Sequence, residues 1–196
     1  MKLMPTPLVG LVEIVTEPHR DSRGSFTRIT CLDELSALAL PGEARLHFVQ
    51  VNLSRSHQRG TLRGLHFQRA PGREAKLIRC LRGAVWDVAV DLRPSSATFG
   101  RWYGTELSEH NQHQLFIPAG MAHGFQTLAD DTELLYQHTA AYRPELDAGV
   151  HHADPQLGIT WPLPPREVSP RDLALPTLID VFGDVSRASI TGGSGS

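Results

Sequence analysis

Hydrophobic and polar positions alternate along several short segments of the chain. In residues 49–54, valine or leucine occupies every odd position and a polar residue every even position. This period of two is typical of a β-strand, whose successive side chains point to opposite faces. The polar row predicts a surface that either lines a binding cavity or faces solvent.

Other segments repeat this pattern between clusters of glycine, proline, asparagine or aspartate. Residues 76–81, the Arg82-Gly83 pair and residues 84–91 together predict a β-hairpin. Three more segments predict short strands: Trp102–Leu107, Gln114–Ile117 and Glu133–Thr139. Many short strands at this spacing favour an all-β barrel or jelly roll.

Capping residues predict two short helices beside these strands. Thr30 can cap a helix over residues 31–40, with Asp33 completing a pair like a capping box and Pro41-Gly42 ending the helix. Residues 169–172 read Ser-Pro-Arg-Asp, which supplies a cap, a proline at the first helical position and an acid in the first turn.

The composition is that of one globular domain. The 196 residues are 40% hydrophobic and 20% charged, and the formal net charge is −2. This balance gives no overall field that would favour nucleic acid or an acidic membrane as a partner. We expect a single domain over residues 1–185 and a flexible tail over residues 186–196, because the chain ends in Gly-Gly-Ser-Gly-Ser.

The same features indicate a cellular compartment. No apolar run approaches the roughly 18 residues of a membrane span, and the first residues lack a signal-peptide pattern, so we expect a cytoplasmic protein. Cys31 and Cys80 do not form a CxxC motif. We expect both to be reduced and Cys80 to lie in the core.

The most informative motif runs from Arg63 to Gln68 and reads Arg-Gly-Leu-His-Phe-Gln, with Lys76 following after it. It places His66 and Lys76 near neighbouring strands of the predicted β domain. A base and a fixed cation held close together suit proton abstraction beside a carbonyl group. Taken alone, a strand histidine or lysine is more often structural or solvated, so the motif needs support from the rest of the chain.

That support comes from a series of blocks in a fixed order between Asp21 and Leu178. The blocks are residues 21–26, 48–54, 63–68, 75–79, 83–93, 118–125, 135–136 and 169–172. Together they resemble the dTDP-4-dehydrorhamnose 3,5-epimerase family of nucleotide-sugar epimerases. The resemblance implies a cupin-type β jelly-roll barrel with short flanking helices, a homodimer, and no metal or other cofactor.

The implied reaction is epimerisation at C3, C5 or both of a nucleotide-linked 4-keto-6-deoxyhexose. The C–H bonds beside the C4 ketone are acidic because the carbanion delocalises onto oxygen as an enolate. By its place in the family motif, His66 matches the base, and Asp172 matches the acid that hydrogen-bonds this base. Lys76 matches the cation at the enolate oxygen. Tyr136 matches the acid that returns a proton from the opposite face.

Further residues match family positions around the substrate. The matches to nucleotide diphosphate ligands are Arg23, Gln50, Asn52 and Arg63. Phe26 matches a residue that reaches the base from the partner subunit, Tyr142 matches an aromatic that packs on the ligand, and His123 matches a second active-site histidine.

Two positions depart from the family pattern. Arg28 stands where an acidic residue typically contacts the nucleotide, and Val51 stands where an acid commonly separates Gln50 from Asn52. Arginine only donates hydrogen bonds, so it cannot replace a carboxylate that accepts one from thymine N3–H. We expect dTDP as the nucleotide because most relatives use it, with CDP and GDP as alternatives.

Two other functions fit a cupin-like chain. The Pro118-x-Gly120-x-x-His123 segment resembles half of a cupin metal signature, but the other half needs His-x-His and the chain has His66-Phe67-Gln68. A metal-dependent cupin is therefore disfavoured, and the loop histidines at positions 110, 113, 151 and 152 are expected on the surface. A non-catalytic sugar-binding cupin would not need the combined base, acid and cation.

Overall fold

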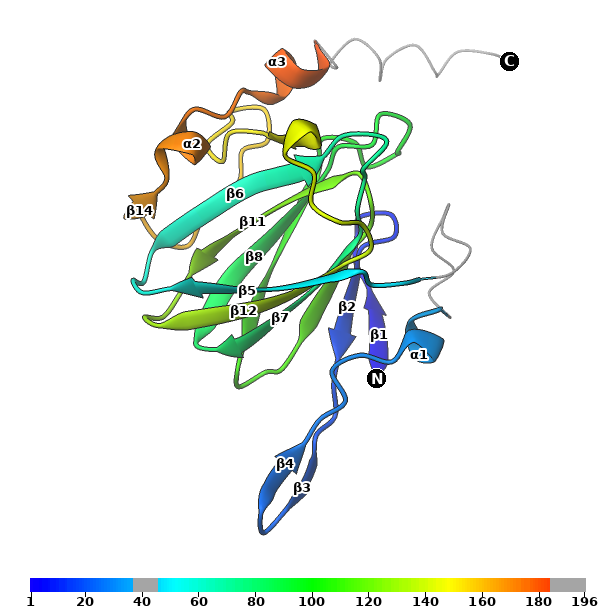
Figure 1. Ribbon diagram of the computed structural model, residues 1–196. Coiled ribbons are helices and arrows are strands. Elements are labelled where there is room, and N and C mark those ends of the chain that lie inside the picture. The colour runs from blue at the N-terminus through cyan, green and yellow to red at the C-terminus, as the bar shows by residue number, and fades with distance from the viewer. Residues whose placement is uncertain (37–45, 184–196) are drawn as a thin grey trace, which may run out of the picture.

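The computed structural model describes residues 1–36 and 46–183, and two β-sheets that face each other make up its body (Figure 1). The strands are β1 (Lys2–Pro5), β2 (Val12–Val15), β3 (His19–Asp21), β4 (Gly24–Phe26), β5 (Gln50–Ser56), β6 (Thr61–Gln68), β7 (Lys76–Arg82), β8 (Ala84–Asp91), β9 (Trp102–Ser108), β10 (Gln114–Ile117), β11 (Met121–Thr127), β12 (Thr132–His138), β13 (Asp147–Gly149) and β14 (Glu167–Val168). The helices are α1 (Leu32–Ser36), α2 (Pro170–Leu173) and α3 (Leu178–Phe182), with one 3₁₀ turn over Pro144–Leu146.

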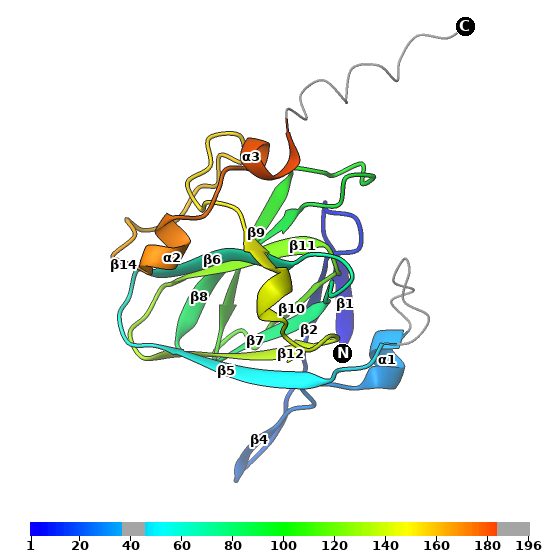
Figure 2. The same ribbon diagram turned by 45° about the horizontal axis from the view of Figure 1, so that its top comes forward.

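The first sheet has the order β1-β2-β10-β7-β12-β5, and the second has the order β13-β6-β11-β8-β9. Neighbouring strands in both sheets are antiparallel. β14 runs parallel to the first residues of β6 and extends the edge that β13 occupies. In Figure 2 the two sheets curve around a common interior.

The main core lies between the inner faces of the two sheets. Ile78 of β7 and Leu134 of β12 meet Val85 of β8 and Phe125 of β11 in one buried cluster. Burying such side chains contributes roughly 1.5–3 kcal/mol each. The alternation of the sequence therefore reflects a sheet-on-sheet core, as expected for a jelly roll.

The predicted strands around Arg82-Gly83 form, but the predicted hairpin between them does not. β7 pairs with β10 and β12, whereas β8 pairs with β9 and β11 in the other sheet. Gly83, at a φ of 75°, carries the chain from one sheet to the other. The hairpin prediction was wrong because both strands turn an apolar face, including Cys80 and Val85, toward the core between the sheets.

The outer faces of both sheets are also covered in part. Val88 and Val90 of β8 pack beneath residues 148–161 and α3, which explains why this strand is buried on both faces. On the first sheet, Phe116 of β10 packs with Leu35 of α1. Because both faces of β8 are covered, few of its positions can be polar, and the strand is almost continuously hydrophobic.

The apolar row of β5 points outward. Val49, Val51 and Leu53 are 53%, 61% and 47% exposed. On the opposite face, Asn52 lines the main cavity of the protein. The polar row is therefore the one that faces a binding cavity, as one of the two sequence interpretations proposed. β5 is an edge strand of the first sheet, and within residues 1–36 and 46–183 its outward side chains stay exposed.

The short helices follow their capping signals only in part. Ser169 caps α2 by accepting a hydrogen bond from the Asp172 amide, with Pro170 at the first helical position, as predicted. α1 starts one residue later than predicted, and the Thr30 hydroxyl instead accepts a hydrogen bond from Gln137. The predicted end of this helix at residue 40 and the expected tail over residues 186–196 lie outside the described residues.

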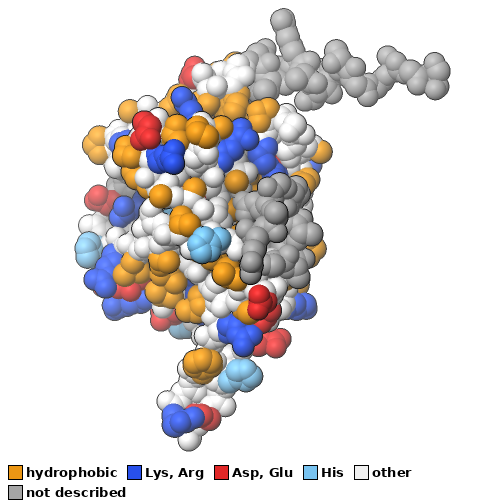
Figure 3. All heavy atoms as spheres, turned by 45° about the vertical axis from the view of Figure 1, so that its right-hand side comes forward, with side chains coloured by type: hydrophobic (Ala, Val, Ile, Leu, Met, Phe, Trp, Pro, Cys, Tyr) orange, Lys and Arg blue, Asp and Glu red, His pale blue; other side chains and the backbone are white. Residues whose placement is uncertain are grey.

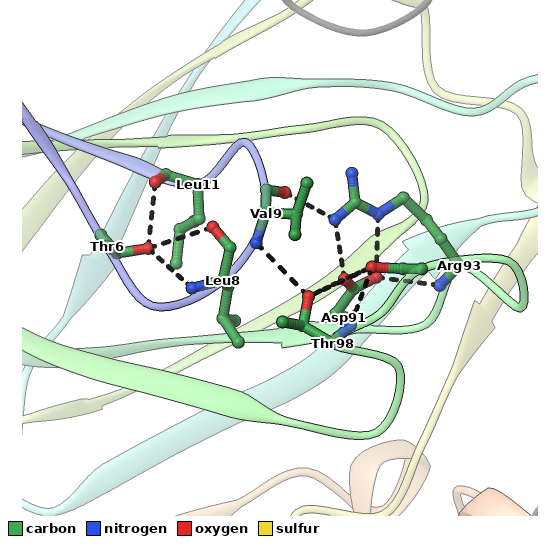
Figure 4. A network of polar contacts seen from close by, with 8 residues as sticks. Thr6, Leu8, Val9, Leu11, Asp91, Arg93 and Thr98 are labelled. Carbon is green, nitrogen blue, oxygen red and sulfur yellow. Dashed lines mark hydrogen bonds and ion pairs between the residues drawn. The ribbon is translucent and has the colours of Figure 1, made fainter. Parts of the chain in front are cut away.

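A polar network joins the β1–β2 loop to the β8–β9 loop (Figure 4). The fully buried Asp91 carboxylate accepts hydrogen bonds from Arg93, Ser96 and Thr98. Arg93 also donates to the Val9 carbonyl at 2.6 Å, and the Val9 amide donates to the Thr98 hydroxyl at 3.3 Å. Although burial opposes ionisation of Asp91, these donors hold its pKa below the usual range.

The loop histidines are not all surface residues. His110 is exposed and His113 and His151 are half-buried, but His152 is only 6% exposed. The His152 carbonyl accepts from the Trp161 indole at 3.0 Å, and its ring stacks on His151. The surface prediction fails for His152 because the 148–161 segment folds back over β6 and β8.

No helix among the described residues is long and apolar enough to span a membrane.

Candidate active site

A cavity of about 650 Å³ opens between the two sheets. One wall comes from β5, β7 and β12, the other comes from β6 and β11, and α2 and β14 stand at the rim. Eight of the twelve predicted catalytic and binding residues line it: His66, Lys76, Tyr136, Asp172, Asn52, Arg63, His123 and Tyr142. Residues up to about 120 positions apart in the chain therefore share one cavity.

His66 and Asp172 form a hydrogen-bonded pair at the cavity wall. The His66 Nε2 lies 2.9 Å from one carboxylate oxygen of Asp172, and the Gly64 amide donates to the other at 3.0 Å. The Ser169 cap fixes the start of α2 and so holds Asp172 against β6. Since a carboxylate only accepts, Nε2 carries the proton and Nδ1 is the nitrogen free to take one.

Burial and charge act in opposite directions on this pair. Burial lowers the pKa of His66 below its usual value, although the neighbouring Asp172 carboxylate opposes that shift. Burial tends to raise the pKa of Asp172, but the Gly64 amide and His66 lower it overall. Asp172 therefore stays ionised while His66 is available as a neutral base near neutral pH.

Lys76 is buried beside this pair, being only 6% exposed. Its ammonium group donates to the His66 carbonyl at 3.4 Å and to Glu74 at 3.2 Å. A lysine in a strand is usually solvated, so its burial at the cavity wall is informative. The ammonium places positive charge beside the base, where negative charge on a ligand oxygen would be stabilised.

Tyr136 faces the same cavity from β12, between two histidines. Its ring meets that of His123 edge-to-face with centroids 5.8 Å apart, and it stacks on His138 at 5.9 Å. Burial raises the pKa of Tyr136 well above its ordinary value, and the charge of Asp87 acts in the same direction. The hydroxyl therefore keeps its proton over the whole physiological range and can act as a donor.

A hydrogen bond to Asp87 of β8 holds the His123 ring in place. Its Nε2 lies 2.9 Å from Asp87, and both side chains are buried. The second oxygen of Asp87 has no hydrogen-bond partner among the described residues. His123 thus supplies a fixed ring against Tyr136, on the opposite sheet from the tyrosine.

The residues predicted at the nucleotide divide into two groups. Asn52, Arg63 and Tyr142 line the cavity, and Gln50 accepts a hydrogen bond from the Tyr142 amide at 3.0 Å. The Arg63 guanidinium donates to the Arg55 carbonyl at 3.1 Å and remains exposed. Gln50, Asn52 and Tyr142 are linked by hydrogen bonds and form what we call the nucleotide end of the cavity, after the family positions that they match, whereas Arg63 contacts Arg55 and Ser56 at the other end of β5.

Arg23, Phe26 and Arg28 do not reach the cavity of their own chain. The β3–β4 hairpin projects away from the body, as Figure 3 shows, and Phe26 is 75% exposed. Arg23 pairs with Asp21 at 2.7 Å. Arg28 pairs with Glu34 at 2.5 Å. The sequence blocks gave no measure of how far this hairpin stands from the body of the chain.

Sequence reasoning missed several cavity residues. Glu74 and His138 line the cavity and contact each other at 2.9 Å, and Arg171 pairs with Asp147 at its rim. His138 falls two positions after Tyr136, so strand alternation alone could have placed both on the same face. Glu74 offered no comparable signal, because it precedes β7 in a loop.

The cupin metal signature is replaced by other contacts. Gln68, at the position of the second histidine, donates to the Ala141 carbonyl and accepts from the Arg143 amide. Within residues 1–36 and 46–183, no group of three or more His, Cys, Asp or Glu side chains could hold a metal ion. The absence of a metal requirement stays a prediction.

Comparison with known proteins identifies the family of the chain. The family model described as dTDP-4-dehydrorhamnose 3,5-epimerase matches residues 5–180. The dTDP-4-dehydrorhamnose 3,5-epimerase of Methanothermobacter thermautotrophicus is 44% identical over 162 residues, or 83% of this chain and 84% of that protein. The dTDP-4-dehydrorhamnose 3-epimerase of Streptomyces niveus is 40% identical over 173 residues, or 88% of this chain and 81% of that protein.

A solved structure extends the likeness to three dimensions. The dTDP-6-deoxy-D-glucose-3,5-epimerase of Legionella pneumophila, in complex with dTDP-4-keto-L-rhamnose, has a TM-score of 0.84 and 40% identity and covers 92% of this chain and 95% of that one. The cupin-type jelly-roll prediction is thereby confirmed, and the fold and cavity define an isomerase of the nucleotide-sugar epimerase class. The chain belongs to the dTDP-4-dehydrorhamnose 3,5-epimerase family.

Proposed function

We propose that the protein inverts C3 and C5 of dTDP-4-dehydro-6-deoxyglucose to give dTDP-4-dehydrorhamnose. The observation that carries this proposal is the convergence of the His66–Asp172 pair, Lys76 and Tyr136 on one cavity. A base, a cation and a protonated phenol are the groups that epimerisation beside a ketone requires. The family and the dTDP-linked sugar bound to the Legionella relative support the choice of substrate.

In this mechanism His66 Nδ1 removes the proton from the carbon beside the C4 ketone. The C–H electron pair moves into a carbon–carbon double bond, and the carbonyl electrons move to oxygen to form an enolate. Lys76 stabilises the negative oxygen, and Asp172 stabilises the imidazolium. The Tyr136 hydroxyl then delivers a proton to the opposite face of the carbon. The phenolate takes a proton from solvent and the His66 imidazolium releases its proton to solvent, so both groups return to their starting forms.

The nucleotide end of the cavity fits this assignment. Asn52 and Tyr142 line this end, Arg63 lines the cavity beside the other end of β5, and arginine forks suit diphosphate oxygens. Arg28 is neutralised by Glu34 in the same chain. Arg28 is held by Glu34 and does not line the cavity of its own chain, so it gives no reason to prefer cytosine or guanine, and the choice of dTDP rests on the family and on the Legionella relative.

The experiment is proton exchange in deuterated water, followed by NMR. With dTDP-4-dehydro-6-deoxyglucose we expect deuterium at both C3 and C5 and formation of the rhamno-configured product. Exchange at C3 alone would favour a second candidate function, that of a 3-epimerase. The Streptomyces niveus relative is a dTDP-4-dehydrorhamnose 3-epimerase. The proposal fails if no dTDP-, CDP- or GDP-linked 4-keto sugar exchanges.

We also propose that the active protein is a homodimer in the cytoplasm. The exposed Phe26 on the projecting hairpin and the outward apolar row of β5, including Val51 at 61% exposure, support a self-association surface. The family resemblance places the hairpin across the subunit boundary, which would bring Arg23 and Phe26 to the partner's cavity. Cys31 and Cys80, both free thiols, fit a reducing compartment.

A further inference from the structure

A buried carboxylate joins the lysine of the site to a histidine that the mechanism does not use. Glu74 places one oxygen 3.2 Å from the Lys76 ammonium and the other 2.9 Å from His138 Nδ1. The three side chains are 8–10% exposed. Although burial opposes ionisation of Glu74, His138 and Lys76 lower its pKa, so the carboxylate is charged at neutral pH.

The other side of His138 leads to the nucleotide end of the cavity. Its Nε2 lies 3.4 Å from the Asn52 amide nitrogen, and the Asn52 amide oxygen accepts from Gln50 at 3.2 Å. The Gln50 amide oxygen in turn accepts from the Tyr142 backbone N–H at 3.0 Å. One unbroken chain of hydrogen bonds therefore runs from the Tyr142 backbone to the Lys76 ammonium.

The groups at the two ends of this chain of hydrogen bonds determine which atom donates in each bond. A backbone N–H can only donate, so Gln50 must present its oxygen to Tyr142 and its nitrogen to Asn52. Asn52 must then present its oxygen to Gln50 and its nitrogen to His138.

The remaining links follow from the carboxylate. Glu74 can only accept, so His138 must donate through Nδ1 and accept from Asn52 through Nε2. Every donor between Tyr142 and Glu74 points toward the carboxylate. Aligned hydrogen bonds of this kind polarise and strengthen one another in a low-dielectric site.

We propose that Glu74 and His138 are positioning residues that hold Lys76 in place and couple it to the amide side chains at the nucleotide end of the cavity. This inference rests on the proposed function, in which Lys76 stabilises the enolate oxygen. Two bonds, to Glu74 and to the His66 carbonyl, orient the ammonium beside the base. A ligand that orders Asn52 thereby also orders Lys76, because both contact the same histidine–glutamate pair.

The first test is His138→Phe, which keeps an aromatic ring against Tyr136 but removes both hydrogen bonds. We expect the kcat of deuterium exchange to fall about tenfold and the Kd for dTDP to rise about fivefold, as for loss of buried hydrogen bonds. The matched control His110→Phe changes an exposed loop histidine and should leave both values unchanged. A change in only one of the two readouts would overturn the coupling, as would no change in either.

The second test is Glu74→Gln, which keeps size but has one acceptor oxygen where the carboxylate has two. Either Lys76 or His138 then faces an amide N–H, so one link must break. We expect a similar loss of kcat, and we expect the Glu74→Gln, His138→Phe double variant to lose no more than the worse single variant. The control is Glu106→Gln on the exposed face of β9. Fully additive losses would contradict a single connected chain.

A spectroscopic measurement tests the direction without any variant. In ¹⁵N NMR of the free protein near neutral pH, His138 should carry its proton on Nδ1 and none on Nε2. A proton on Nε2 would contradict the assignment. These outcomes are separate from failure of the proposed function, because in that case the unmodified protein would show no exchange while the tautomer and the dTDP affinity could still be measured. Melting temperatures of all variants by circular dichroism identify any loss that comes from unfolding.

Discussion

At the scale of single residues, the surroundings of His66 favour a proton acceptor, and those of Tyr136 favour a proton donor. His66 and Tyr136 are both partly buried, and burial favours the neutral form of each. A neutral imidazole is a base, and a neutral phenol is an acid. In the reaction that we propose, the same desolvation would prepare the two residues for opposite roles.

Asp172→Asn should shift the acid side of the pH profile. The His66 base works only when unprotonated, so the rate falls as pH drops through its pKa, which lies below the usual value of about 6.5. Asp172 raises this pKa, so removing its charge should move the acid limb to lower pH. The maximal rate should drop about 100-fold, because the imidazolium loses its partner.

The measurement is kcat/KM for deuterium exchange across the acid range. Asp33→Asn, at an exposed position in α1, is the matched control and should keep the original profile. An acid limb that moves to higher pH in Asp172→Asn would contradict the electrostatic account of the pair.

Tyr136→Phe should separate proton removal from inversion. His66 and Lys76 remain, so deuterium should still enter the substrate at a rate within about tenfold of the original. Net inversion should fall by about 100-fold or more, because no donor remains on the opposite face. Parallel NMR measurement of exchange and product formation checks this, and equal losses in both would exclude tyrosine as the opposite-face acid.

At the scale of elements, the close approach of β6 and β11 sets the position of the base. A Cβ added at Gly64 would lie 2.5 Å from the Gly124 Cα, and Gly64 has a φ of 121°, which favours glycine. The Gly64 amide also donates to Asp172. Gly64 and Gly124 thus allow β6 and β11 to approach closely, which places His66 of β6 beside both β11 and α2.

The network around Asp91 (Figure 4) should make a measurable contribution to stability. Asp91→Asn keeps the shape but removes the charge that Arg93 and Thr98 contact, so the free energy of unfolding should fall by about 1.5–3 kcal/mol. Because the folded pKa of Asp91 is lowered, its contribution is present above the unfolded pKa of about 3.9 and is lost as pH falls through the folded value.

Urea unfolding near neutral pH and again in acid checks both parts of this prediction. The difference between Asp91→Asn and the original protein should shrink in acid, where the original Asp91 is itself protonated. A difference that stays constant with pH would contradict the assignment of this effect to charge.

At the scale of the whole molecule, the projecting hairpin and β5 leave apolar side chains without a covering layer. Phe26, Val51 and Leu53 are among the most exposed large hydrophobic residues in the described part of the chain. An edge strand with such a row is open to pairing with another molecule. The self-association that we propose would cover these side chains.

Light scattering during gel filtration should give twice the 21.6 kDa mass of the chain. Val51→Glu should shift the protein toward the monomer, because it would bury a charge in the proposed interface. Val9→Glu, at an exposed valine in the β1–β2 loop, is the control and should remain dimeric. A monomeric original protein at micromolar concentration would exclude the dimer.

The sequence alone was sufficient for the local features. Short apolar segments between turn-forming residues predicted β10 at Gln114–Ile117 and β8 at Ala84–Asp91, and the Ser169 cap predicted the start of α2. These features depend on neighbouring residues, so a short window of sequence contains their cause. The ordered blocks also indicated the family and a candidate set that includes His66 and Lys76.

Which strands pair with one another depended on contacts between residues that are far apart in the sequence. β7 and β8 adjoin in sequence but lie in different sheets, because each needs an apolar face in the common core. The chain of hydrogen bonds from Tyr142 to Lys76 joins residues from two loops and three strands. Strand alternation gives the face of a side chain, but only the pairing of β12 with β7 in the first sheet brings the Glu74 carboxylate, the His138 imidazole and the Lys76 ammonium within hydrogen-bonding distance.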